Sequence, residues 1–198
     1  MKFYKFTLIF ALTCFLSSCK NEKKNDNLET EMELNDEYDN EAMNKNDEVK
    51  EIAFNLESKS DSSTSGKVIF TEENGQVSMV VDITGATEGK HAIHIHEKAD
   101  CSSDDGKSTG GHWNPTAQPH GQWGDEEGYH RGDIGNFEAD AEGNAQITMT
   151  TNKWCIGCDD DNKNIIDKAI IVHEGVDDFT SQPSGAAGTR ISCGAIIQ

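Results

Sequence analysis

Short strand-like runs, in which apolar residues recur among polar ones, follow one another after residue 48 and are separated by turn-forming residues. Successive side chains of a β-strand point to opposite faces, so such a run predicts a strand with a buried face. The runs cover residues 52–56, 67–71, 77–83, 92–96, 145–150 and 169–172. No long segment carries the helical repeat of three to four residues. The pattern therefore predicts an all-β domain.

Turn-forming residues indicate how these strands connect. Asn74-Gly75 lies between two runs and predicts a tight hairpin, because both residues accept the positive φ angles of such a turn. The stretch over residues 110–136 is dense in Gly, Pro, Asn and Asp and predicts a long loop. We expect an antiparallel Greek-key β-sandwich or barrel over residues 48–198, with long loops folded over its outside.

The first 18 residues carry a different pattern. Lys2 and Lys5 precede an apolar run over residues 6–16, which is far shorter than the roughly 20 residues of a membrane span, and small residues follow. Residues 1–18 are therefore predicted to be an export signal peptide. Its end, Leu16-Ser17-Ser18-Cys19, resembles a bacterial lipobox, in which Cys19 is lipid-modified and becomes the mature N-terminus. The alternative is an ordinary signal peptide in which Cys19 is incidental.

Residues 19–47 are rich in Asn, Glu, Lys and Asp and hold few large apolar side chains. Such a segment buries too little surface to offset the entropy of ordering it. We interpret it as a disordered tether between a lipid on Cys19 and the domain. The expected location is extracytoplasmic, in the periplasm or at the cell surface, on a membrane anchor.

The whole chain is strongly acidic, with a formal net charge of −19. This charge argues against a nucleic-acid partner, because nucleic-acid binding depends on Lys and Arg neutralising phosphates. It would also repel a small anion at long range, although salt screens charges beyond about 10 Å at 0.1 M ionic strength. Any anionic ligand would therefore depend on local positive charge.

The histidines supply candidate chemistry. His94 and His96 are two residues apart in a predicted strand, so their rings share one face and leave Ile93 and Ile95 on the other. His91 has the opposite parity and is excluded from this pair. Two histidines on a half-exposed strand are unremarkable by themselves, and the residues that follow decide whether the pair binds a metal.

Three more histidines and a carboxylate lie in the long loop. They are His112, His120, His130 and Asp133. Neutral imidazole suits zinc and copper, and three His with one carboxylate supply the four ligands of a closed tetrahedral zinc site. A metal bound by these residues would order the loop.

Seven strings of this sequence, in chain order, resemble those of the copper/zinc superoxide dismutase family and span nearly the whole second half of the chain. They are His94-Ile95-His96-Glu97, Asp100-Cys101, Gly111-His112-Trp113-Asn114-Pro115, His120-Gly121, His130-Arg131-Gly132-Asp133-Ile134-Gly135-Asn136, His173-Glu174 with Asp177-Asp178, and Gly188-Thr189-Arg190-Ile191-Ser192-Cys193-Gly194. One such match is weak, but seven in order are very improbable by chance.

The resemblance implies a role for each position. The implied copper ligands are His94, His96, His112 and His173, and the implied zinc ligands are His112, His120, His130 and Asp133. In this scheme the imidazolate of His112 bridges the two metals. Asp177 accepts hydrogen bonds from one ring of each set and fixes both. Arg190 lies beside the copper and holds a small anion.

The resemblance also implies an activity, the dismutation of superoxide to dioxygen and hydrogen peroxide. Copper would cycle between two oxidation states, zinc would serve structure, and His112 and Arg190 would be the catalytic residues. The alternative is a non-enzymatic lipoprotein that stores or delivers copper. A zinc hydrolase fits poorly, because every candidate ligand is used and no free carboxylate is placed as a general base.

Four cysteines remain beyond the N-terminal region. The resemblance to the family implies a disulfide between Cys101 and Cys193, because the family has paired cysteines at these positions. Cys155 and Cys158 depart from the family pattern, and the pair could be a structural disulfide, a copper-handling thiol pair or a redox-active pair; export favours the disulfide. The segment 179–188 is short for this family and holds no Lys, so we expect weaker steering of superoxide. Dimer contacts vary between lineages of the family, so a homodimer is left open.

Overall fold

The computed structural model describes residues 49–198. The predicted signal peptide over residues 1–18, the predicted lipidated Cys19 and tether over residues 19–47, and Glu48 lie outside the described residues. In the described part of the chain, no helix is long and apolar enough to cross a membrane.

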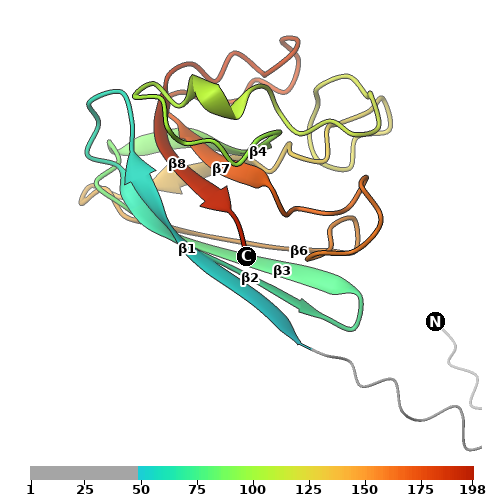
Figure 1. Cartoon of the computed structure of the whole chain (residues 1–198). Helices are drawn as coiled ribbons and strands as arrows, with labels where there is room; N and C mark the ends of the chain where they lie inside the picture. Colours follow the sequence, from blue (N-terminus) through green and yellow to red (C-terminus); the bar gives the residue numbers. More distant parts are fainter. Residues whose placement is uncertain (1–48) are drawn as a thin grey trace, which may run out of the picture. The chain divides into compact units, whose positions relative to one another are not determined.

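Eight antiparallel strands form one sheet that curls into a nearly closed barrel (Figure 1). The strands are β1 (Lys50–Ser58), β2 (Ser65–Glu73), β3 (Gln76–Thr84), β4 (Gly89–His96), β5 (Gly135–Ala139), β6 (Ala145–Thr151), β7 (Lys168–His173) and β8 (Arg190–Ile196). Their order across the sheet is β5-β4-β7-β8-β1-β2-β3-β6. A short 3-10 turn, η2 (Lys107–Thr109), lies in the long loop after β4. The predicted all-β fold is confirmed.

Each predicted run falls inside a strand, and the hairpin is formed where expected. Asn74 and Gly75 have φ angles of 52° and 72°, the pair of positive values that a two-residue type I′ turn requires. β2 and β3 leave this turn in register, with Glu73 opposite Gln76. β5 and β8 were missed, because the first is short and the second is interrupted by Gly and by polar residues.

The core lies between the two halves of the curled sheet. Every second residue of β2 and β3 points into it, and Val68, Phe70, Met79 and Val81 have no exposed surface. β4 differs, because residues 91–96 are all buried. One face of β4 packs in the core, and the long loops over residues 97–134 and 174–189 cover the other side of this part of the barrel (Figure 1).

The turn that contains Cys155 and Cys158 closes one side of the core. The two sulfurs form a disulfide, and Ile156 between them is buried. The N–H of Ile156 donates to Glu72 at 2.8 Å, and its carbonyl accepts from Lys50 Nζ at 2.8 Å. Of the three interpretations left open by the sequence, this anchored turn supports a structural disulfide.

Candidate metal centre

β4 supplies the foundation of the site. His94 and His96 lie on its outer side, opposite Ile171 and Ala169 of β7. The segment that carries His112 extends β4 as an added bridge, because His96 pairs with His112 in antiparallel fashion. The sequence thus brings the His-x-His pair and the first loop histidine together through main-chain pairing.

The loop that carries His130 and Asp133 is held to the same strand. Gly132 donates its N–H to Trp113 O at 3.0 Å, and its own carbonyl accepts the N–H of Ile95 at 2.9 Å. A Cβ at Gly132 would collide with the carbonyl of Ile95. Glycine is therefore required here for the loop to approach the strand closely.

Two groups of side chains converge at this point, and each could hold a metal ion. The first is His94, His96, His112 and His173, and the second is His112, His120, His130 and Asp133. Within each group the candidate ligand atoms lie within 4.8 Å of one another, and all seven residues are buried. His112 belongs to both groups.

The ring nitrogens show that metal ions fit these groups. Seven buried side-chain polar atoms in the described residues have no hydrogen-bond partner, and six of them are one nitrogen from each of these six histidines. They are His94 Nδ1, His96 Nε2, His112 Nε2, His120 Nδ1, His130 Nδ1 and His173 Nε2. Buried polar atoms without a hydrogen-bond partner are costly and rare, so this cluster indicates that the six nitrogens bind another group.

The opposite ring nitrogens of His94, His96 and His120 are hydrogen-bonded to the protein, which fixes the orientations of these rings. Asp177 accepts a hydrogen bond from His94 Nε2 at 2.9 Å and another from His120 Nε2 at 2.8 Å. His96 Nδ1 donates to Gly110 O at 3.0 Å. A nitrogen that donates its proton leaves the other nitrogen of the ring with a free lone pair. The hydrogen bonds therefore select the tautomers that can bind metal.

Distances around Asp133 match those between ligands that share one ion. His120 Nδ1 and His130 Nδ1 lie 3.0 Å and 3.1 Å from its carboxylate oxygens, yet neither makes a well-aligned hydrogen bond. Four ligands at the usual zinc distance form a tetrahedron with edges of about 3.3 Å. The second group therefore has the size of a tetrahedral zinc site.

Burial and charge favour the ligand forms of four of these residues, whereas the carboxylates of Asp133 and Asp177 raise the pKa of His120 to about 9 against the effect of burial. Burial lowers the pKa of His96 and His173 well below the usual value, so both are neutral at pH 7. Burial also lowers the pKa of His112 to about 4, against the opposing pull of Asp133. Burial would raise the pKa of Asp133, but the close contacts of its carboxylate with His112, His120 and His130 hold that pKa well below the usual value.

Asp177 links the two groups and is itself firmly held. Burial would raise its pKa, but hydrogen bonds from His120, His94 and the N–H of Phe179 hold that pKa below its usual value. The amide of Asn136 bonds to both the N–H and the carbonyl of Asp177, at 2.8 Å and 2.9 Å. This fixed carboxylate positions one ring of each group.

A cavity of about 310 Å³ opens beside the first group. His96, His112 and His173 of the first group line it, and Arg190 lines it as well. Among the residues that line it, Arg190 carries the fixed positive charge. The arrangement suits a small anion beside the first group.

The remaining predictions also have their places. His91 is outside both groups; it is buried, stacks on Phe137 and has Nδ1 3.1 Å from the carbonyl of His173. Cys101 and Cys193 form the second disulfide.

Reasoning from the sequence missed Gln182, whose amide bonds to both the N–H and the carbonyl of His120 at 2.9 Å. Nothing in the local sequence pointed to that contact.

Comparisons with known proteins identify the family. The family description "Copper/zinc superoxide dismutase (SODC)" matches residues 64–196. The chain belongs to the copper/zinc superoxide dismutase family. A superoxide dismutase [Cu-Zn] of Podospora anserina is 38% identical over 146 residues, which cover 69% of this chain and 91% of that protein.

Further relatives agree with this assignment. An extracellular superoxide dismutase [Cu-Zn] of Drosophila melanogaster is 39% identical over 139 residues, which cover 66% of this chain and 74% of the relative. Among solved structures, a double mutant of a SOD-like protein from Bacillus subtilis matches with a TM-score of 0.66 at 30% identity. That match covers 74% of this chain and 97% of the other. The protein is thus a superoxide dismutase enzyme that uses copper and zinc.

Proposed function

We propose that the first group holds copper, that the second holds zinc, and that the imidazolate of His112 joins the two ions. The shared position of His112 carries this proposal. Its Nε2 is unpartnered among the first group, while its Nδ1 lies 2.8 Å from Asp133 in the second. The carboxylate-containing group suits a closed zinc site, and the all-imidazole group beside the cavity suits copper.

Bound copper supplies one-electron chemistry, accepting an electron from one superoxide and returning it to the next. The side chains of the protein bind the anion and transfer the proton. Arg190 holds the superoxide anion in the cavity through its guanidinium. His112 takes up a proton at Nε2 while Nδ1 stays in the zinc group, and it passes that proton to the peroxide product. The second proton of hydrogen peroxide comes from water.

Filling both groups with copper tests the shared ring. Two Cu(II) ions joined by one imidazolate couple magnetically, so the EPR signal of the wild-type dicopper protein is expected to fall far below that of two isolated ions. His112→Ala removes the ring and should restore an uncoupled signal. A full uncoupled signal from the wild-type dicopper protein would rule out the bridge.

The same variant separates the enzyme from a copper store. His112→Ala is expected to abolish dismutation while three histidines of the first group still bind much of the copper. Superoxide consumption at the wild-type rate in this variant would show that His112 has no catalytic role. The storage alternative relied on Cys155 and Cys158 as thiols, and in the structure these sulfurs are bonded to each other.

We also propose an extracytoplasmic location with a lipid anchor on Cys19. Two disulfides within the described domain and the extracellular Drosophila relative support the location. The anchor rests on the lipobox-like sequence alone. Cells fed a labelled fatty acid should label the wild-type protein but not Cys19→Ser, and equal labelling would contradict the anchor. A homodimer stays a proposal that sizing of the purified protein would test.

A further inference from the structure

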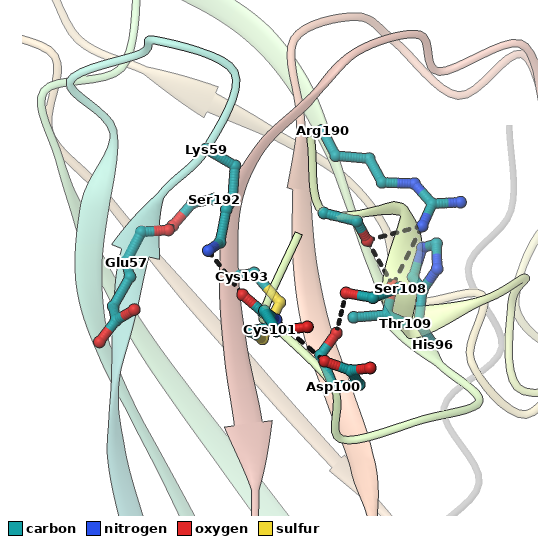
Figure 2. The surroundings of a disulfide bond; sticks show 12 residues. Glu57, Lys59, His96, Asp100, Cys101, Ser108, Thr109, Arg190, Ser192 and Cys193 are labelled. Atoms are coloured by element: carbon teal, nitrogen blue, oxygen red, sulfur yellow. Dashed lines mark hydrogen bonds between the residues drawn. A yellow bond between two sulfur atoms is a disulfide. The ribbon is translucent and has the colours of Figure 1, made fainter. Parts of the chain in front are cut away.

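Arg190 is fixed by a contact that the family resemblance did not indicate. Its Nη1 donates to Gly106 O at 2.9 Å and to the hydroxyl of Thr109 at 3.0 Å. That hydroxyl in turn donates to Gly106 O at 2.8 Å. Figure 2 shows Arg190 reaching across to Thr109 on the loop after β4. These three hydrogen bonds join Nη1 of Arg190, the hydroxyl of Thr109 and the carbonyl of Gly106 in a closed triangle.

The triangle leaves the rest of the guanidinium free for a ligand. Nη1 carries two protons, and both are used by Gly106 and Thr109. The three remaining N–H groups, on Nη2 and Nε, make no hydrogen bond within the described residues. Arg190 lines the cavity beside His96 and His173, so a free N–H fork is available to an anion there.

The loop beneath Arg190 is built to stay in place. Gly106 has a φ of 68°, and a Cβ at that position would lie 3.3 Å from Cβ of Arg190. The Cys101–Cys193 disulfide ties the start of this loop to β8, the strand that begins with Arg190 (Figure 2). Thr109 has no exposed surface. The hydroxyl that meets Arg190 is thus held on a fixed support.

We infer that Thr109 is a positioning residue for Arg190, whose hydroxyl anchors Nη1 and so aims the other N–H groups at the anion. An arginine side chain has several rotatable bonds, and an unanchored guanidinium spreads over many positions. Anchoring one amino group removes most of that freedom before the anion arrives. This inference rests on the proposed function, because it takes Arg190 as the group that holds superoxide.

A purely structural role for Thr109 makes a different prediction. Its bond to Gly106 also stabilises η2, so losing the hydroxyl could act by loosening the loop. Ser108 offers a matched control in the same turn. Its hydroxyl donates to Asp100 O and does not contact Arg190. Ser108→Ala therefore weakens the loop without touching the guanidinium.

The test uses the full chain loaded with copper and zinc, with azide as the anion probe. Thr109→Val keeps the size of the side chain and removes the hydroxyl, while Thr109→Ser keeps the hydroxyl. Thr109→Val is expected to weaken azide binding, followed in the visible spectrum, by at least about tenfold, the effect of one lost hydrogen bond to a charged group. Thr109→Ser and Ser108→Ala should bind azide like the wild type. If Thr109→Val does not fold, Thr109→Ala against Thr109→Ser gives the same comparison.

The same substitutions in an Arg190→Ala background decide the mechanism. If Thr109 acts through Arg190, Thr109→Val should add nothing there. An equal loss in both backgrounds, or a wild-type azide affinity in Thr109→Val, would overturn the inference while leaving the role of Arg190 intact. If Arg190→Ala itself binds azide like the wild type, the proposed role of Arg190 fails, and the inference fails with it.

Discussion

At the scale of single residues, the carboxylate of Asp177 is the most consequential group that lies outside both ligand sets. It accepts one ring proton from His94 and one from His120, so it orients a member of each group. An asparagine at this position keeps the shape but presents an NH₂ group to one of these rings. Two donors would then face each other, and one histidine would lose its orientation.

Asp177→Asn is therefore expected to weaken zinc binding by about 10–100-fold, the usual effect of removing a partner that orients a metal ligand. The equilibrium partition of zinc between the protein and a coloured chelator measures this change in affinity. Asp178→Asn is the matched control, because Asp178 is exposed and bonds to Thr180 and Ser181. Equal zinc loss from both variants would mean that the loop, and not the carboxylate, holds the site.

The sequence predicted these residues to different degrees. Strand parity put His94 and His96 on one face and separated His91 from them, and the structure has all three in those places. The contacts of Thr109 and Gln182 were not predictable, because each joins positions more than 60 residues apart and depends on how two loops pack. Neither residue belongs to a motif that carries chemistry by itself.

At the scale of elements, the two disulfides close loops of very different length. The sequence separation is 92 residues for Cys101–Cys193 and 3 for Cys155–Cys158. In the chain-entropy description, the stabilisation from a cross-link grows with the logarithm of loop length. The longer loop corresponds to about 4.6 kcal/mol and the shorter to about 1.6 kcal/mol.

Replacing both Cys101 and Cys193 by Ser should therefore lower the free energy of unfolding about three times as much as replacing Cys155 and Cys158. Urea unfolding of the metal-free proteins, followed by fluorescence, gives both values. The copper site should respond only to the first pair, since that disulfide fixes the loop under Arg190. A larger loss from the second pair would show that the short turn carries the stability.

Strands were predictable where the side-chain pattern was strong. β2, β3 and the hairpin between them follow from alternation and from Asn74-Gly75. β8 was missed because Arg190, Ser192 and Gly194 interrupt its apolar pattern. Two of these residues are required by contacts that a local pattern does not show. Arg190 lines the cavity, and Gly194 leaves room for the main chain of β1, because a Cβ there would lie 2.8 Å from Asn55 O.

At the scale of the whole molecule, charge opposes the substrate. The net charge is −19, and superoxide is an anion. Asp105 adds to this effect beside Arg190, with which it interacts electrostatically, and a hydrogen bond with Lys107 lowers the pKa of Asp105 to about 2. The same contact, 2.9 Å between carboxylate and ammonium, offsets the positive charge of Lys107.

Asp105→Asn should therefore raise the rate constant for superoxide by about twofold at low ionic strength, with the difference shrinking as salt screens the charge. Glu51→Gln serves as control, because it removes an exposed negative charge at the end of β1 away from the residues that pair with β8. Decay of superoxide at several salt concentrations measures both variants. A rate that falls in Asp105→Asn would mean that Asp105 helps Arg190 more than it repels superoxide.

The most direct test of the account is the decay of superoxide after a radiation pulse, measured with the full chain loaded with copper and zinc and again after copper alone is removed. We predict fast, catalytic decay that disappears with copper and returns when copper is restored, while zinc remains bound throughout. Tight copper binding without faster decay would contradict the account.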